Sequence, residues 1–342
     1  MQRTPAEDGF FMPAEWSPHK RCFISWPCTE ETWSGHLKEA RRAYSEVVKA
    51  INRFEPVTLL SDPSTTVGAR TAVGPDVEIM EMPLDDAWIR DNGPNFVCTE
   101  DNRVAASCFS FNGWGGRFPH EKDAQVPVAL AKALNIRRYE APMVLEGGSI
   151  CVDGEGTLLT TESCLLNKNR NPNMSKEDIE KILRSYLGIK KVLWLKQGIH
   201  KSMIDGHIDG IAAFARPSTV LLAQHDDKSN PNHLNMIENK ELLSTFTDAK
   251  GRGIEIIDFP MPDNTELDGH RLAACYPNFY FANGGIVLPV FGEEKDKSTF
   301  EILENLFPER ELIGVRSEYI AIGGGDVHCI TQQLPAGYFA LP

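Results

Sequence analysis

The sequence of 342 residues predicts a single α/β domain. Five segments with helical spacing of apolar residues are each followed by a short apolar stretch typical of a strand, at intervals on the order of 60 residues. Further β-branched stretches lie between these pairs and indicate several strands per helix. No linker rich in Pro, Gly or Ser divides the chain, so residues 1–342 are expected to form one domain.

The first helix is predicted over residues 37–54, because its apolar residues recur at intervals of three and four. It runs directly into a predicted strand over residues 57–60. The apolar positions of this helix are Leu37, Ala40, Tyr44, Val47, Val48, Ile51 and Phe54.

A second clear helix is predicted to begin after Ser175. The segment Ser-Lys-Glu-Asp provides an N-cap with acidic residues in the first turn, and Gly188 is expected to end the helix. The stretch 192–195 is then predicted to be a strand. The apolar stripe of this helix consists of Ile179, Ile182, Leu183, Tyr186 and Leu187.

The same alternation predicts three more helix and strand pairs, and four apolar stretches predict strands between the pairs. The pairs are 124–135 with 143–145, 232–246 with 254–259, and 298–307 with 311–315. The intervening strands are predicted at 104–111, 149–152, 157–161 and 219–222.

Composition limits the classes of partner. The net charge of −13 disfavours nucleic acid and anionic membranes; it would attract a small cationic ligand, although charge alone is explained more simply by solubility. The leading residues MQRTPAEDGFFMPAEW lack the apolar stretch of a signal peptide, and no later run reaches the roughly 20 apolar residues that span a bilayer. A soluble, cytoplasmic protein is therefore expected.

The eight cysteines are scattered in apolar surroundings, without a Cys-x-x-Cys pair. This pattern fits a reducing compartment, where most free cysteines behave as small core residues. They are Cys22, Cys28, Cys98, Cys108, Cys151, Cys164, Cys275 and Cys329.

Four segments combine apolar residues with polar or reactive ones: 85–91, 145–148, 205–209 and 323–333. Each is weak evidence alone, since a carboxylate at a strand end is most often a cap or turn residue. Together they supply a thiol, an imidazole and several carboxylates, which suits nucleophilic catalysis.

The thiol is Cys329, which follows three consecutive glycines that let the backbone approach a ligand. A free cysteine with a pKa near 8.5 is only about 3% thiolate at pH 7, so a nucleophilic Cys329 requires a nearby cation. The adjacent His328 points to the opposite face if this stretch is extended, and it is therefore interpreted as structural.

The imidazole is His207. If residues 207–209 form a strand, the two-residue spacing directs His207 and Asp209 to the same face. Glu146 is a candidate to orient His207 and raise its pKa. Asp91 is a second carboxylate for a planar cation, and the indole of Trp88 is available to pack on that cation.

A metal-dependent chemistry is an alternative, because Asp205, His207 and Asp209 also resemble the manganese-binding segment of ureohydrolases. A two-metal site needs further carboxylates, but no two aspartates in the chain are separated by a single residue. The segment Gly324 to Asp326 also lacks an immediately following histidine. A site without a metal or another cofactor is therefore favoured.

Several motifs then give a specific resemblance along nearly the whole chain. The sequence resembles the guanidine-modifying superfamily and, within it, the agmatine deiminases of plants and bacteria. The motifs are Met12–Trp16, Trp88–Pro94, Leu145–Ser149, Leu165–Pro172, Gly206–Asp209, Asn283–Ile286 and His328–Gln333. The resemblance implies a five-bladed α/β propeller, or pentein, with pseudo-fivefold symmetry and an active site on its axis. It also makes a homodimer plausible.

The resemblance implies roles for individual residues. Cys329 is the implied nucleophile and His207 the acid and base, supported by Glu146, while Asp91 and Asp209 hold the guanidinium. The implied reaction converts agmatine, through a covalent thiouronium, into N-carbamoylputrescine and ammonia, a step toward putrescine. Four further residues are candidates for substrate contacts, namely Trp88, Asp85, Trp114 and Arg117.

Departures from the family pattern leave the substrate open. The segment 197–205 lacks the acidic cluster common in plant agmatine deiminases, and Gly210 and Asp326 each stand where asparagine is usual. Arg117 is either a surface residue or a partner for a substrate carboxylate. The alternatives are a deiminase of free or peptide-bound arginine or of another guanidino compound, an amidinotransferase, and a non-catalytic guanidine-binding protein.

Overall fold

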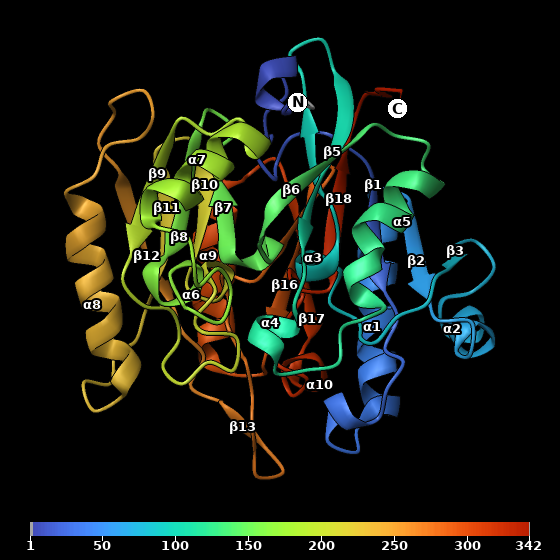
Figure 1. Ribbon diagram of the computed structural model, residues 1–342. Coiled ribbons are helices and arrows are strands. Elements are labelled where there is room, and N and C mark those ends of the chain that lie inside the picture. Colours follow the sequence, from blue (N-terminus) through green and yellow to red (C-terminus); the bar gives the residue numbers. More distant parts are fainter. Residues whose placement is uncertain (1–2, 342) are drawn as a thin grey trace.

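The computed structural model describes residues 3–341 as a mixed α/β fold made of small sheets with helices packed around them (Figure 1). Met1, Gln2 and Pro342 lie outside the described residues, so the start of the leading stretch is not covered. The helices α8 and α2 lie at opposite edges of the view in Figure 1.

Four sheets repeat one topology. Two strands pair antiparallel, a helix follows, and the next strand pairs parallel with the second strand. The first comprises β4 (Asn95–Cys98), β5 (Arg103–Ser110), α5 (Val126–Ala133) and β6 (Arg138–Val144). The second comprises β7 (Ile150–Val152), β8 (Thr157–Thr161), α7 (Lys176–Leu187) and β9 (Lys191–Leu195). The third comprises β10 (Ala212–Arg216), β11 (Thr219–Gln224), α8 (Pro231–Ser244) and β12 (Glu255–Pro260). The fourth comprises β15 (Tyr280–Ala282), β16 (Gly285–Val290), α9 (Glu294–Leu306) and β17 (Glu311–Arg316).

A fifth sheet has the same topology but joins the two ends of the chain. Strand β18 (Thr331–Pro335) pairs antiparallel with β1 (His19–Ser25), and β1 pairs parallel with β2 (Val57–Ser61) after helix α1 (Leu37–Asn52). The strands β1 and β18 were not predicted, and neither were β4, β10, β15 and β16 of the other four sheets.

The remaining elements are short. They are η1 (Ala6–Asp8), η2 (Glu31–Trp33), α2 (Thr66–Val73), β3 (Glu78–Glu81), α3 (Ile89–Asn92), α4 (Gly113–Gly116), η3 (Asp123–Gln125), η4 (Gly147–Ser149), α6 (Glu162–Leu165), η5 (Ile208–Gly210), β13 (Glu266–Leu267), β14 (His270–Arg271), α10 (Glu318–Ala321) and β19 (Tyr338–Phe339).

All five predicted helices are confirmed, and α7 shows why. The side chain of Ser175 accepts a hydrogen bond from the backbone N–H of Asp178, and the Asp178 carboxylate accepts one in return from the N-cap backbone. Gly188 ends the helix in the left-handed region at φ 65°. The boundary that differs most is the start of α9, where a capping box between Glu293 and Asp296 begins the helix at Glu294 rather than at 298.

The strands predicted within the helix and strand pairs and between those pairs are also confirmed, with one large shift. Strand β6 covers Arg138–Val144 instead of 143–145. Its residues alternate between exposed and buried positions, with Tyr139, Ala141 and Met143 facing the core. This two-residue alternation is typical of a half-buried strand and was present in the sequence.

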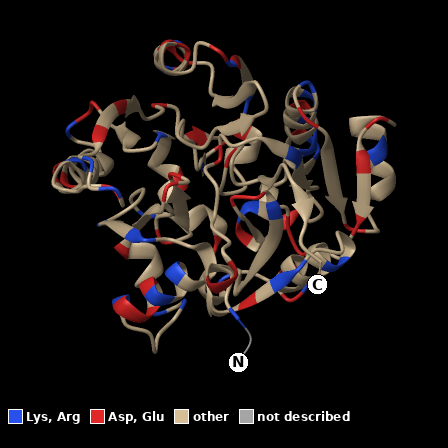
Figure 2. Cartoon of the chain, turned by 90° about the horizontal axis from the view of Figure 1, so that it is seen from above, with Lys and Arg blue, Asp and Glu red and all other residues tan. Residues whose placement is uncertain are grey.

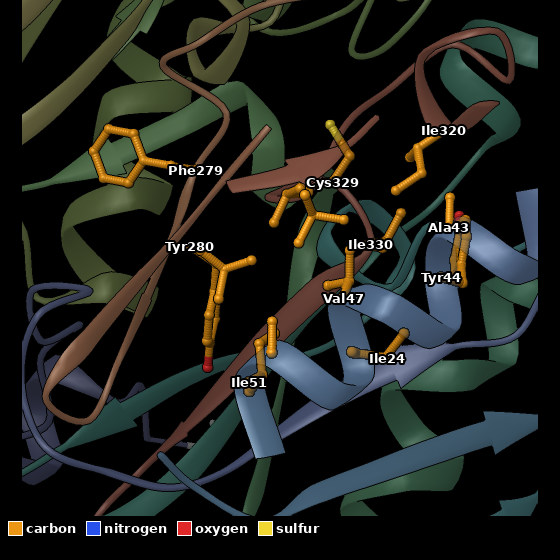
Figure 3. Close-up of a cluster of buried hydrophobic side chains, with 14 of the residues drawn as sticks. Ile24, Ala43, Tyr44, Val47, Ile51, Phe279, Tyr280, Ile320, Cys329 and Ile330 are labelled. Atoms are coloured by element: carbon orange, nitrogen blue, oxygen red, sulfur yellow. The ribbon is translucent and has the colours of Figure 1, made fainter. Parts of the chain in front are cut away.

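The largest buried cluster packs α1 against the fourth and fifth sheets and extends to Cys329 (Figure 3). Each fully buried aliphatic side chain of this kind, such as Val47 or Ile51, stabilises the fold by about 1.5–3 kcal/mol. In Figure 3 the sulfur of Cys329 points away from Val47 and Ile51. The core therefore anchors the backbone of Cys329 while its thiol faces elsewhere.

Charge and hydropathy are distributed as in an ordinary globular protein. Acidic and basic residues are interspersed in the view of Figure 2. Among residues 3–341, none of the helices combines the length and the apolar character needed to cross a bilayer.

Candidate active site

Five turns, one from each repeated sheet, carry the polar side chains of the candidate site. Each turn immediately precedes the first strand of an antiparallel pair, namely β4, β7, β10, β15 or β18. Helix α3 contacts η4, and η4 contacts η5, so the turns lie side by side. The residues they carry are Asp91, Glu146, His207 with Asp209, Asn278 and Cys329.

Gly148 lies where three of these side chains meet. A Cβ atom at this position would lie 2.7 Å from Oδ2 of Asp209, 2.8 Å from Oδ1 of Asp91 and 2.8 Å from Nδ1 of His207. The backbone N–H of Gly148 donates a hydrogen bond of 2.9 Å to Oδ1 of Asp91. The absence of a side chain at Gly148 thus allows two carboxylates and an imidazole to converge.

Asp91 is buried and fixed by neutral donors. Besides the Gly148 bond, its Oδ2 accepts a hydrogen bond of 2.8 Å from Nε1 of Trp114. Burial raises the pKa of Asp91, and the carboxylates of Asp209 and Glu146 raise it further, against the opposing effect of His207. A cation that binds beside Asp91 therefore relieves an excess of negative charge.

Asp209 contacts both His328 and Cys329. Its Oδ2 lies 3.1 Å from Nδ1 of His328 and 3.4 Å from Sγ of Cys329. The prediction that His328 points away from Cys329 was wrong, because residues 323–330 form turns rather than an extended strand. Nε2 of His328 contacts Glu15 at 2.9 Å, so this histidine links two carboxylates. Burial raises the pKa of Asp209, but the contact with His328 lowers it and the net shift is downward.

His207 lies between two carboxylates. Its Nε2 is 3.5 Å from Oε2 of Glu146, and its Nδ1 is 3.7 Å from Oδ1 of Asp91. Burial lowers the pKa of His207, but Asp91, Cys164 and Glu146 outweigh burial and hold this pKa well above its ordinary value. Within residues 3–341 neither buried ring nitrogen has a hydrogen-bond partner, so the protein leaves the hydrogen-bonding capacity of this imidazole unused.

The predicted strand at 207–209 was wrong, although the two side chains still converge. His207 has extended backbone angles and precedes the 3-10 helix η5, which contains Asp209. Their approach to Gly148 thus results from a tight turn and not from strand alternation.

Glu146 is held by a buried arginine that the sequence analysis did not single out. Nε of Arg170 lies 2.9 Å from Oε1 of Glu146, and both side chains are fully buried. Arg170 also forms an ion pair with Asp205. Burial opposes ionisation of Glu146, but His207 and Arg170 together lower its pKa. Glu146 is therefore a fixed anion behind His207.

Cys329 is held by a second unpredicted residue, Asn278. Oδ1 of Asn278 accepts hydrogen bonds from the backbone N–H groups of His328, at 3.0 Å, and Cys329, at 3.2 Å. The same oxygen lies 3.3 Å from Sγ of Cys329. Burial raises the pKa of the Cys329 thiol well above its ordinary value, and Asp209 and Asp91 add to this effect. This shift favours the thiol over the thiolate in the free protein.

Two cavities meet at Cys329. The larger, of about 210 Å³, is lined by Trp88, Asp91, Trp114 and Cys329 together with residues of the surrounding loops. The smaller, of about 40 Å³, is lined by His207, Asp209, Asn278 and Cys329 among others. The sulfur is therefore accessible from two sides, and the imidazole belongs to the smaller cavity.

Two of the predicted ligand contacts need correction. The carboxylate of Asp85 accepts a hydrogen bond of 2.7 Å from the backbone N–H of Lys122, and Asp86 lines the larger cavity in its place. Arg117 lies outside the residues that line this cavity and forms a bidentate ion pair with Asp205, at 2.7 and 3.0 Å. Its guanidinium is therefore already satisfied within the protein.

The alternative set of metal ligands is not brought together. Asp205 is paired with Arg117 and Arg170 and does not approach His207 as a third ligand would. Within residues 3–341, the group with metal-binding spacing is Glu146, Cys164 and His207. In that group Arg170 binds Oε1 of Glu146, while Oε2 faces Cys164 and His207.

Comparison with known proteins gives consistent matches over the whole length. Residues 11–335 match the family of Porphyromonas-type peptidyl-arginine deiminases. The chain is 41% identical over 358 residues to the agmatine deiminase of Pseudomonas aeruginosa (strain LESB58), covering 97% of each protein. It is 40% identical over 360 residues to the agmatine deiminase of Stutzerimonas stutzeri (strain A1501), covering 98% of each. Its structure matches that of the agmatine deiminase of Enterococcus faecalis with a TM-score of 0.94 and 34% identity, covering 98% of both chains.

Proposed function

Because the chain belongs to the Porphyromonas-type peptidyl-arginine deiminase family, in which it is related to agmatine deiminases, we propose that it hydrolyses agmatine to N-carbamoylputrescine and ammonia. One observation carries this proposal. A thiol, an imidazole and two carboxylates meet where two cavities adjoin, at Cys329.

Asp91 and Asp209 bind the guanidinium of the substrate. Each oxygen of Asp91 already accepts one hydrogen bond and keeps a further lone pair for a substrate N–H. Each such charge-assisted bond contributes roughly 1.5–3 kcal/mol. Trp88, in the wall of the same cavity, packs on the planar cation.

In the first step the positive charge of the bound guanidinium lowers the pKa of Cys329, and the thiol releases its proton to solvent through the cavity. The thiolate forms a bond to the central guanidinium carbon. The C–N bond to a terminal amino group then breaks, and His207, whose pKa is held well above its ordinary value, supplies the proton with which ammonia leaves. The product of this step is a cationic thiouronium on Cys329 and a neutral His207.

In the second step His207 takes a proton from water, and the resulting hydroxide attacks the thiouronium carbon. The C–S bond breaks, a neutral urea group forms, and the remaining proton returns the sulfur to the thiol. The smaller cavity of about 40 Å³ borders His207 and Cys329 and has room for one water molecule. An alkylamine acceptor needs more space on that side, which favours hydrolysis over amidino transfer.

A deiminase of free or peptide-bound arginine is the second candidate. It requires a cationic partner for the substrate carboxylate, and Arg117 was the candidate for that role. The bidentate pair with Asp205 already satisfies Arg117, which favours agmatine as the substrate.

A substrate panel on purified, chelator-treated protein tests the proposed reaction. Agmatine, arginine, a peptide with an internal arginine and butylguanidine are each assayed for ammonia, urea and ureido product. We expect equal amounts of ammonia and N-carbamoylputrescine, with the highest kcat/KM for agmatine. Release of urea, or turnover of another guanidine without ammonia from agmatine, overturns the proposal.

We further propose that residues 1–342 form one catalytic domain in which the five repeated sheets surround a pseudo-fivefold axis, as in a pentein. The placement of one site residue before the first strand of each sheet supports this arrangement. A cytosolic location fits the free thiols of the eight cysteines. A homodimer is a further proposal, which sedimentation tests.

The raised pKa of Cys329 predicts how the thiol reacts with alkylating agents. With neutral chloroacetamide, the alkylation rate should rise about tenfold per pH unit from pH 7 to 9 without a plateau, because the thiolate is the reactive form. The cationic isostere chloroacetamidine should react at pH 7 at least about tenfold faster, after correction for intrinsic reactivity, because its charge lowers the thiol pKa.

Mass spectrometry of Cys329 over a pH series measures both rates. Asp91→Asn should reduce the advantage of the cationic reagent, since it removes a charge that attracts the amidinium. A plateau near pH 7 for the neutral reagent contradicts a protonated thiol in the free protein.

Gly148→Ala is expected to lower kcat/KM for agmatine by about 100-fold, because the new methyl group displaces Asp91, Asp209 and His207 from their common position. Stability should fall by about 1–3 kcal/mol through overpacking. The control is Gly68→Ala in α2, where no atom lies within 4 Å of the added Cβ. Steady-state kinetics and thermal unfolding measure both effects, and wild-type activity in Gly148→Ala contradicts the geometry.

A further inference from the structure

The larger cavity contains two carboxylates that the proposed reaction does not use, Glu31 and Asp86. Glu31 is exposed and begins η2, while Asp86 is half-buried and lies just before Trp88. The two are connected through Thr32, whose hydroxyl donates a hydrogen bond of 2.7 Å to Oδ2 of Asp86. This part of the cavity is therefore acidic and separate from the Asp91 and Asp209 pair.

The Asp86 carboxylate is held by neutral donors only. Besides Thr32, it accepts hydrogen bonds from Nε1 of Trp88, at 3.0 Å, and from the backbone N–H of Ala87, at 2.8 Å. The nearby Lys122 directs its ammonium to Asp62, at 3.8 Å, and to the Leu84 carbonyl, at 3.2 Å.

Within residues 3–341 neither Asp86 nor Glu31 forms an ion pair with a basic side chain. Burial raises the pKa of Asp86 to about 6, so this carboxylate is still ionised at pH 8. A partly buried anion without a cation is unfavourable. A cationic ligand in the cavity supplies the missing charge.

The indole of Trp88 connects this carboxylate to the reacting sulfur. At one end Nε1 donates to Asp86. At the other end Cζ3 lies 2.6 Å from the position of a Cβ at Gly325, and that position is 3.0 Å from Sγ of Cys329. The ring therefore extends from Asp86 toward the sulfur along the wall of the cavity.

The agmatine chain has a suitable length and character for this path. From the guanidinium carbon to the terminal amine there are six bonds, which span about 7 Å when extended, at the rise per bond of an extended backbone. Apolar side chains also line the cavity and suit the four methylene groups. They are Phe118, Met203, Ile204 and Ile322.

Among the described residues that line the larger cavity, the acids are Glu31, Asp86 and Asp91, and Asp91 is assigned to the guanidinium. The segment before His207 contains one acid, Asp205, and Arg117 and Arg170 both pair with it. We propose that Asp86, assisted by Glu31, binds the terminal ammonium of the substrate and thereby selects amine-tailed guanidines over neutral or carboxylate-bearing ones. This inference rests on the proposed deimination for its substrate, but its binding test does not depend on turnover.

The test compares agmatine with butylguanidine, which has the same chain and no ammonium, at pH 8. In Asp86→Asn the ratio of kcat/KM for agmatine to that for butylguanidine should fall about 10- to 100-fold, the loss expected for one charge-assisted bond. In Glu31→Gln the fall should be only about 2- to 5-fold, because Glu31 is exposed to solvent.

Two controls remove the same charge from adjacent positions. The Asp85 carboxylate binds the backbone of Lys122, and Glu30 does not line the cavity. Asp85→Asn and Glu30→Gln should leave the substrate ratio unchanged. A fall in these variants as large as in Asp86→Asn assigns the effect to general electrostatics and overturns the proposal.

A Cys329→Ser background gives a binding readout without chemistry. Calorimetry should show that agmatine binds more tightly than butylguanidine and that Asp86→Asn removes most of this difference. An equal loss for both ligands means that Asp86 only positions Trp88, and no loss means that the amine binds elsewhere; either result overturns the inference. A protein that binds agmatine in this way but releases no ammonia refutes the proposed reaction and leaves the amine site standing.

Discussion

Cys329→Ser is expected to lower kcat/KM for agmatine at least about 10⁴-fold, the scale on which loss of a nucleophile acts. A serine hydroxyl at this position is a far weaker acid than a thiol, and even a bound guanidinium cannot ionise it appreciably. Asn278 still accepts hydrogen bonds from the backbone at residues 328 and 329, so the local structure should persist. Steady-state kinetics and thermal unfolding separate the two effects.

The covalent step gives an independent measurement. Acid-quenched wild-type protein with agmatine should carry an added mass equal to agmatine less ammonia on Cys329, and Cys329→Ser should carry none. Cys98→Ser removes a half-buried thiol outside the site and serves as the matched control. Turnover by Cys329→Ser within about 100-fold of wild type contradicts covalent catalysis by this residue.

His207→Gln is the second substitution with a large expected effect. Because His207 both donates a proton to the departing ammonia and accepts one from water, its loss should lower kcat about 10³- to 10⁴-fold. Glutamine retains polar contacts but cannot carry a proton between the two steps. Glu146 and Asp91 lose the cation that lies between them, so stability should be compared in parallel.

The acid role can be isolated with the S-methyl isothiouronium analogue of agmatine, whose leaving group departs as a thiolate without prior protonation. In a single turnover, His207→Gln should release methanethiol much faster than it releases ammonia from agmatine. Hydrolysis of the enzyme adduct should remain slow, because the base is still missing. Equal impairment with both substrates contradicts the role of His207 as the acid.

The five helices of the repeated sheets and about half of the strands could be predicted from the sequence, because their signals are local. Examples are the capping box at Ser175, the αL glycine at 188 and the apolar stripe of α1. The predicted boundaries were wrong where the signal was weaker. An example is β6, in which charged residues on the exposed side alternate with apolar ones on the buried side. The strands β1 and β18 were missed, and their pairing joins segments from opposite ends of the chain, which no local pattern can indicate.

The supporting residues of the site could not be found in the same way. Arg170 occurs in a polar loop and resembles a surface residue until the fold buries it against Glu146. Asn278 precedes a strand, as the other four site segments do, and recognition of the repeated topology is the signal that finds it. Asp85 and Asp86 are adjacent, and only the structure shows which of them faces the cavity.

The sequence by itself determined the fold class, the positions of the main helices and the reactive residues Cys329, His207, Asp91, Asp209 and Glu146 as candidates. Spacing and residue type carry this information over a few turns of chain. Only the tertiary structure decided which of these groups meet at Gly148, which counter-charges hold them and which candidates point elsewhere. Contacts between five turns distant in sequence depend on how the sheets pack, and no local pattern encodes that packing.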